Sequence, residues 1–134
     1  AYVRTIIPKE MNDSITFSGT VAYEEIPLLL SGAQVCAYPS HMESFGLTLI
    51  EAMALEKPIV AADIGPFKEI MENEASGLLC NPNDPKEIAN KISKLFDNKE
   101  KAQKLAKNAR NTVLNKFDID SILKENIQFY KSII

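Results

Sequence analysis

The sequence predicts an α/β fold in which a parallel sheet carries helices on both faces. Short, apolar, β-prone runs recur at residues 34–38, 59–62 and 77–80, and a helix-forming segment separates each run from the next. Such runs are typical of strands buried on both sides, because the helices that connect parallel strands cover both faces of the sheet. A further run, at residues 15–18, predicts another strand near the beginning of the chain.

Helical segments fill the spaces between these strands. Residues 1–10 indicate the tail of a helix that stops near Pro8. A short helix is predicted over residues 24–30 and an apolar helix over residues 46–55. Pro66 begins the next helix, which continues to residue 72.

Three helices complete the chain. Asp84, Pro85 and Glu87 form the N-terminal cap of the first. Apolar residues at helical spacing give the last helix a stripe that another surface must cover. The three helices are predicted over residues 85–96, 99–116 and 120–133. The chain thus divides into a core, residues 1–97, and C-terminal helices, residues 98–134.

Length and composition fix the broad class. A chain of 134 residues with 46% hydrophobic and 25% charged residues is typical of one globular domain. The net charge of -3 argues against nucleic-acid binding. Cys36 and Cys80 lack metal-ligand spacing, so we predict reduced core cysteines in a cytoplasmic protein. The chain does not begin with Met, and we expect that its start is not a natural N-terminus.

The loop and helix start at residues 39–52 are the candidate ligand site. They follow a buried strand, which is where open α/β sheets bind ligands. A helix N-terminus offers free N–H groups and a positive dipole end, which suit a phosphate. Glu43 in the loop and Glu51 in the helix frame this site. Glu51 is unusual in so apolar a helix, because a buried carboxylate needs a partner.

The segment E-S-F-G-L-T-L-I-E, residues 43–51, resembles the E-x7-E motif of retaining glycosyltransferases of family 4. These enzymes have the two-domain GT-B fold, built of Rossmann-like sheets. Further motifs in register extend the resemblance over about residues 14–97, among them P-S at residues 39–40, E-A-M-A at 51–54 and K-P-I-V-A at 57–61. The resemblance implies a partial donor-binding domain, the C-terminal half of such an enzyme. Two strands and a helix of the half-domain, including a central strand, would precede residue 1.

The resemblance also implies roles for individual residues. Glu51 would accept hydrogen bonds from the two ribose hydroxyls, and Glu43 would hold the donor sugar near its reacting carbon as the catalytic carboxylate. Backbone N–H groups would hold sugar and diphosphate oxygens, and a second loop would lie against the base. The first group comprises Ser44, Phe45, Gly46, Leu47 and Thr48, and the second Gly19, Thr20 and Val21. No metal and no other cofactor is expected.

The implied reaction transfers a sugar from a nucleotide diphosphate to an acceptor, with retention at the anomeric carbon. The acceptor, a glycan, lipid or small molecule, would bind a missing N-terminal domain. In the family, an Arg and a Lys that stabilise the diphosphate precede the equivalent of residue 1. Of the nearby cations here, His41, Lys57 and Lys68, none occupies the motif position. We therefore predict weak donor binding and no turnover by this chain alone. Glu56 also departs from the family, which usually turns with Gly there.

Two other classes remain as alternatives. A non-catalytic nucleotide-binding or regulatory α/β domain would keep the fold without the reaction. A receiver-like or flavodoxin-like module would need an acidic cluster or phosphate loop after the first strand, and residues 19–22 offer neither. Self-association through an exposed sheet edge, and peripheral location at the inner face of the membrane, are further expectations.

Overall fold

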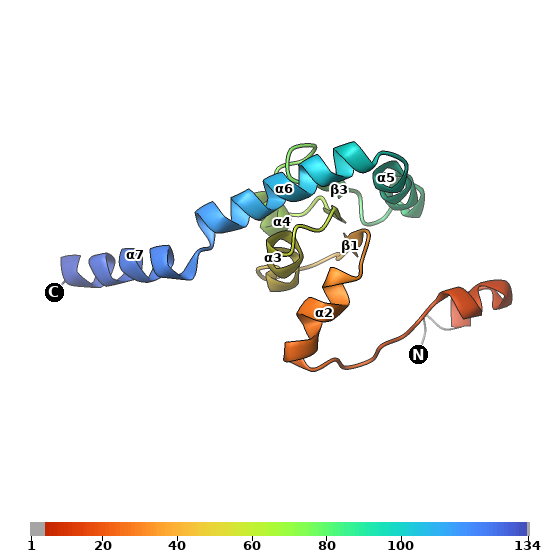
Figure 1. The fold of residues 1–134 in the computed structure, drawn as a ribbon, viewed down its shortest axis with the longest axis horizontal. Coiled ribbons are helices and arrows are strands. Elements are labelled where there is room, and N and C mark those ends of the chain that lie inside the picture. The colour runs from red at the N-terminus through yellow and green to blue at the C-terminus, as the bar shows by residue number, and fades with distance from the viewer. Residues whose placement is uncertain (1–4, 134) are drawn as a thin grey trace.

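The computed structural model describes residues 5–133 and shows a three-stranded parallel sheet (Figure 1). Its strands are β1 (Cys36–Tyr38), β2 (Ile59–Ala62) and β3 (Leu78–Cys80), in the order β1-β2-β3. Cys36 is opposite Ile59, and Val60 is opposite Leu78. The predicted α/β class, with a parallel sheet flanked by helices, is confirmed.

Helices and 3-10 turns connect and follow the strands. They are η1 (Lys9–Ser14), η2 (Tyr23–Glu25), α2 (Ile26–Ser31), α3 (Leu47–Ala54), α4 (Gly65–Ile70), α5 (Pro85–Asp97), α6 (Lys99–Lys116) and α7 (Ile119–Ser132). Asp84 caps α5 as predicted, because its side chain accepts hydrogen bonds from the N–H groups of Lys86 and Glu87. Residues 5–6 are helical and the helix ends before Pro8, as expected, whereas residues 1–4 lie outside the described part of the chain.

The core has two clusters, one on each face of the sheet. Ile59 and Ala61 of β2 belong to the first cluster, together with Met53 of α3 and Phe67 of α4. Val60, the residue between them, belongs to the second cluster, which α5 helps to cover. Successive side chains of a strand point to opposite faces, so the continuous apolar run of β2 supplies both clusters. Residues of α6 contribute to both.

The prediction of a strand at residues 15–18 is wrong. The backbone at Ile15 is extended, with φ -124° and ψ 122°, but the structure places this segment in no strand. It runs apart from the sheet, on the way from η1 to α2 (Figure 1). A β-prone run forms a strand only where a neighbouring strand pairs with it, and β1 is too far from this segment to do so.

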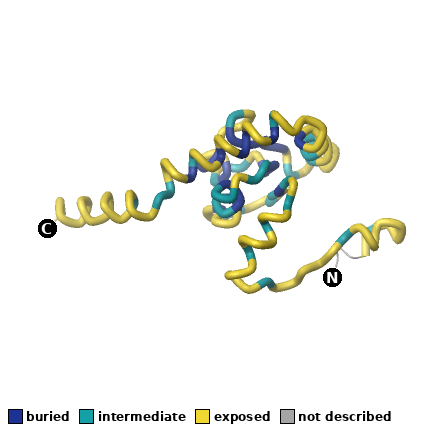
Figure 2. Tube along the Cα trace, viewed as in Figure 1, coloured by how far each residue is buried: buried dark blue, intermediate teal, exposed yellow. Residues whose placement is uncertain are grey.

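Every buried residue that the structure describes lies between Cys36 and Val113. We call β1 through α6 the body, and residues 5–31 the N-terminal arm. Figure 2 shows the buried residues concentrated in the body, while the N-terminal arm and α7 are mostly exposed. The apolar stripe predicted for the last helix is uncovered: Ile119 is 73% exposed and Leu123 55%. Within residues 5–133 no helix is both long and apolar enough to cross a membrane.

Two glutamates have left-handed backbones, Glu56 with φ 56° and Glu74 with φ 62°. This conformation favours glycine, because a Cβ crowds the following carbonyl. Glu56 is exposed and lies two residues after the end of α3. Glu74 differs, because its carboxylate pairs with Lys94 at 3.0 Å and with Lys101.

Candidate functional site

The candidate site lies at the carboxyl end of β1, where residues 39–46 lead into α3. The carbonyl of Gly46 accepts hydrogen bonds from Leu49 N–H, at 3.0 Å, and from Ile50 N–H, at 3.2 Å. No side chain within residues 5–133 caps this end of the helix. The N–H groups of Leu47 and Thr48 therefore point out of the first turn without an intrahelical acceptor. Free N–H groups at the positive end of a helix dipole are chemically suited to an anion.

Gly46 fixes the position of this helix start. Its φ of 100° is left-handed, and it is buried against α4. A Cβ at this position would lie 2.9 Å from Cε1 of Phe67 and 3.3 Å from Cδ1 of Ile70. We expected Gly46 to let a ligand approach, and the structure adds a second reason for glycine, which is contact with α4.

Tyr38 also holds the start of α3. Its hydroxyl donates to the carbonyl of Thr48 at 3.0 Å and so ties the end of β1 to the first turn of the helix. Burial raises the pKa of Tyr38 strongly, and the neighbouring Cys36 and Glu51 raise it further. The phenol therefore stays protonated and remains a donor. No pattern in the sequence indicates this positioning role of Tyr38, because the contact depends on how the strand and helix pack.

The loop residues lie between Tyr38 and Gly46. Glu43 is half-buried, and its Oε1 accepts a hydrogen bond from Ser44 N–H at 3.0 Å. The ring of Phe45 meets that of Phe117 edge to face, with centroids 6.1 Å apart, so the loop packs on the end of α6. Ser44 and Phe45 are otherwise exposed, as are Leu47 and Thr48.

Glu51 faces a different surface. It lines a cavity of about 190 Å³ between α3 and the arm, together with Tyr23, Glu24, Ile26, Pro27, Leu30 and Leu55. The walls are mainly apolar, and Glu51 and Glu24 supply the carboxylates. Neither Glu43 nor the loop from Gly19 to Val21 lines this cavity. Tyr23 and Pro27 were not predicted to belong to the site, although they follow closely after the predicted base loop in the sequence.

The predicted base loop lies in the N-terminal arm. Gly19 has a left-handed φ of 67°, and a Cβ there would meet nothing within 4 Å. Thr20 is exposed and Val21 half-buried. Gly19 therefore allows the backbone to turn, and the loop that precedes Tyr23 stays open to solvent.

Two of the three nearby cations are engaged elsewhere. Lys57 donates to the carbonyl oxygens of Ser31, at 2.5 Å, and Ala33, at 3.3 Å, at the end of α2. Lys68 pairs with Asp63 at 3.0 Å. His41 is exposed in the loop. Across residues 5–133, no group of His, Cys, Asp or Glu side chains is arranged to hold a metal ion.

The body is a Rossmann-like α/β fold with a three-stranded parallel sheet, and comparison with known proteins identifies the family. The chain belongs to the family described as Glycosyl transferases group 1, whose model matches residues 4–112. Its structural neighbours are glycosyltransferases of the GT-B fold.

Individual relatives give the extent of the likeness. Glycogen synthase of Mycobacterium tuberculosis is 32% identical over 114 residues, which are 85% of this chain and 28% of that protein. Sucrose-phosphate synthase from Thermosynechococcus elongatus is 34% identical with a TM-score of 0.86, covering 92% of this chain and 31% of that one. HepE of Anabaena in complex with UDP is 30% identical with a TM-score of 0.87, covering 92% and 34%. The chain thus spans about a third of the length of each.

Proposed function

We propose that this chain is the donor-binding part of a retaining glycosyltransferase of family 4, which transfers a sugar from a nucleotide diphosphate to an acceptor. The observation that carries the proposal is the uncapped start of α3, with Glu43 in the loop before it and Glu51 further along the same helix beside a cavity, in a chain of this family. Complexes of the similar HepE with UDP and with UDP-glucose support a nucleotide sugar as the donor.

The start of α3 is the proposed diphosphate site. Leu47 and Thr48 N–H groups would donate to phosphate oxygens, with help from the helix dipole worth about 1 kcal/mol. Negative charge grows on the leaving diphosphate during the transfer, so fixed donors at this point favour the transition state. No metal is required by this arrangement.

The cavity beside Glu51 is the proposed nucleoside site. The Glu51 carboxylate would accept hydrogen bonds from both ribose hydroxyls. Tyr23 and Pro27 offer apolar surface for the base, which the backbone of residues 19–21 would approach from the open side. The identity of the base then depends mainly on the N-terminal arm.

Glu43 is the proposed catalytic residue. The hydrogen bond from Ser44 N–H orients its carboxylate in the loop, leaving oxygen lone pairs for sugar hydroxyls. Glu43 would hold the sugar ring with its anomeric carbon toward the acceptor.

The activity of the whole protein would require parts beyond this chain. Lys57 and Lys68 are occupied by other partners, so little positive charge besides the helix start is available to a diphosphate here. We therefore expect weak donor binding and no sugar transfer by the chain alone. Roles in polysaccharide synthesis, a cytoplasmic location with peripheral membrane association, and self-association along the free edge of β1 belong to the same proposal.

Titration with UDP and GDP, followed by NMR of backbone amides, tests the donor site. The proposal expects shifts at residues 43–48, Glu51, Tyr23 and residues 19–21, with a dissociation constant in the millimolar range, about 1 mM. Absence of any response to either nucleotide would contradict it. A non-catalytic nucleotide-binding domain would give the same shifts, so the second arm measures sugar transfer by a longer chain that includes the acceptor half. Nucleotide shifts without any sugar transfer by the longer chain would favour that alternative, and transfer undiminished by Glu43→Gln would contradict the role proposed for Glu43.

A further inference from the structure

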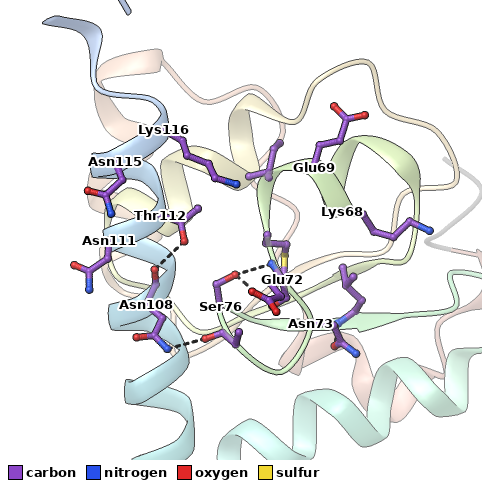
Figure 3. A pocket seen from close by; sticks show the side chains of 14 residues that line it. Lys68, Glu69, Glu72, Asn73, Ser76, Asn108, Asn111, Thr112, Asn115 and Lys116 are labelled. Atoms are coloured by element: carbon purple, nitrogen blue, oxygen red, sulfur yellow. Dashed lines mark hydrogen bonds between the residues drawn. The ribbon is translucent and has the colours of Figure 1, made fainter. Parts of the chain in front are cut away.

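One hollow on the surface lies away from the residues of the proposed donor site. It is a groove of about 790 Å³ between α4, the turn that follows it, and the second half of α6. Figure 3 shows Thr112 and Lys116 on α6 facing α4 across the groove. None of the residues predicted to bind the donor lines it.

The floor of the groove is apolar and its walls are polar. Ile70 and Met71, which are 3% and 2% exposed, form part of the floor. Asn108, Asn111 and Asn115 line one wall on successive turns of α6. Asparagine is a poor helix former, so three in the last turns of one helix cost helix stability without improving the core.

The groove has amide side chains available to a ligand, whereas the hydroxyls of Ser76 and Thr112 are bonded to the backbone. Asn108 donates to the carbonyl of Ala75 at 2.9 Å and supports the opposite turn. Ser76 is engaged by the backbone of Glu72 (Figure 3). The side chains of Asn111 and Asn115 make no hydrogen bond within residues 5–133, and each can both donate and accept.

The charges that line the groove balance. Lys68 and Lys116 are matched by Glu69 and Glu72. A site for a phosphate or a nucleic acid would carry an excess of positive charge. A balanced set of charges with amides and an apolar floor fits a neutral ligand that has many hydroxyls and apolar C–H faces.

The groove adjoins the proposed reaction site through two contacts. Ile70 on its floor packs against Gly46 at the start of α3. Lys116 at its end precedes Phe117, whose ring contacts Phe45 in the loop. A chain bound along α6 would thus approach the loop that carries Glu43.

We propose that the groove between α4 and α6 binds a neutral glycan chain, held by the asparagine side chains of α6. The proposal takes sugar chemistry from the family, but shares no residue with the proposed donor site. Glycan binding here would keep an acceptor or product chain close to the enzyme between transfers.

The test titrates this chain with maltotetraose and, separately, with mannotetraose, up to about 20 mM, while NMR follows the backbone amides. The proposal expects at least one sugar to shift amides of residues 108–116 and 70–76. The double variant Asn111→Ala and Asn115→Ala should weaken that binding at least fivefold. Alanine favours the helix at both exposed positions, so the variant should fold. Asn90→Ala, at an exposed position of α5 outside the groove, is the matched control and should bind as the unaltered chain does.

Three results would overturn the proposal: no shift with either sugar, shifts confined to residues 43–51, or equal affinity of the double variant. A UDP titration on the same samples reports separately on the donor site. Loss of the UDP response with retained glycan shifts would count against the proposed function alone, and the reverse pattern against the groove alone.

Discussion

The body and the N-terminal arm are held very differently, although the proposed donor site uses both. The start of α3, with Gly46 and Thr48, is fixed by buried contacts and by the Tyr38 hydrogen bond. Tyr23 and the loop at Gly19 belong to the arm, which contains no buried residue in the part that the structure describes. The half of the site proposed for sugar and diphosphate is therefore preorganised, whereas the half proposed for the base is less constrained.

The largest effect is expected from removing a core side chain of the body. Phe67→Ala should lower the free energy of unfolding by about 3–5 kcal/mol, because it leaves a cavity beneath α3. Leu28→Ala in the arm should change it by less than about 0.5 kcal/mol, because Leu28 is 77% exposed. Urea unfolding followed by circular dichroism measures both, and Phe67→Leu supplies a milder variant if alanine prevents folding. Equal losses of unfolding free energy in Phe67→Ala and Leu28→Ala would contradict the view that the arm is less tightly packed than the body.

Gly46 and Gly19 allow the body and the N-terminal arm to be compared within the proposed donor site. Gly46→Ala should cost about 2–4 kcal/mol, because the left-handed backbone is strained and the new methyl meets Phe67. Gly19→Ala is strained as well but meets no neighbouring atom, and the arm can adjust locally. Its effect on global unfolding should stay below about 0.5 kcal/mol. Thermal unfolding of the two variants side by side checks this, and a Gly19→Ala loss as large as that of Gly46→Ala would show that the arm folds with the body.

Substitutions of Glu51 and Glu43 should weaken the binding of different ligands. Glu51→Gln should weaken UDP binding by roughly tenfold, since a carboxylate that accepts two hydrogen bonds is replaced by an amide. Glu43→Gln should leave UDP binding unchanged and weaken only the extra affinity for UDP-glucose. NMR titration with each ligand measures both, with unaltered thermal unfolding as the control. The assignment of roles fails if the two variants affect UDP equally.

Glu56 and Glu74 allow a smaller test of backbone strain within the body. Glu56→Gly should stabilise the protein by about 1 kcal/mol, because glycine accepts the left-handed conformation and the lost side chain makes no ion pair within residues 5–133. Glu74→Gly relieves the same strain but loses contacts with Lys94 and Lys101, so its net effect should be closer to zero. Denaturant midpoints rank the two, and a larger gain for Glu74→Gly would contradict this account.

The smallest effect concerns pH. Hydrogen bonds from Lys101 and then Lys94 lower the pKa of Glu74. A lowered pKa in the folded state adds stability that is present above the ordinary glutamate value, about 4.3, and is lost as the pH falls through the folded value. Because the side chain is 48% exposed, the contribution should be below about 1 kcal/mol. The stability difference between the unaltered chain and Glu74→Gln should therefore shrink on acidification from neutral pH, and a constant difference would argue against it.

Local patterns in the sequence predicted most of the body. Continuous apolar runs located β1, β2 and β3, and Asp84 marked the cap of α5, because these signals depend on near neighbours. The run at residues 15–18 has the same local character, yet strand formation needs a partner that the local sequence does not report. The candidate site also combines residues that the local sequence predicts with residues that it does not. The loop and start of α3 followed from residues 43–51, whereas the cavity wall at Tyr23 and the bond from Tyr38 arise from packing between distant segments.

The hydrogen bond between Tyr38 and Thr48 has a consequence for how such a protein can diversify. It joins the two ends of the loop that carries Glu43, independently of the residues inside that loop. Substitutions and small changes of length between these ends would alter the surface offered to a sugar while α3 stays in place. Selectivity for the proposed donor sugar and integrity of the fold could therefore change separately, and residues 39–42 are the segment to randomise in a test of that separation.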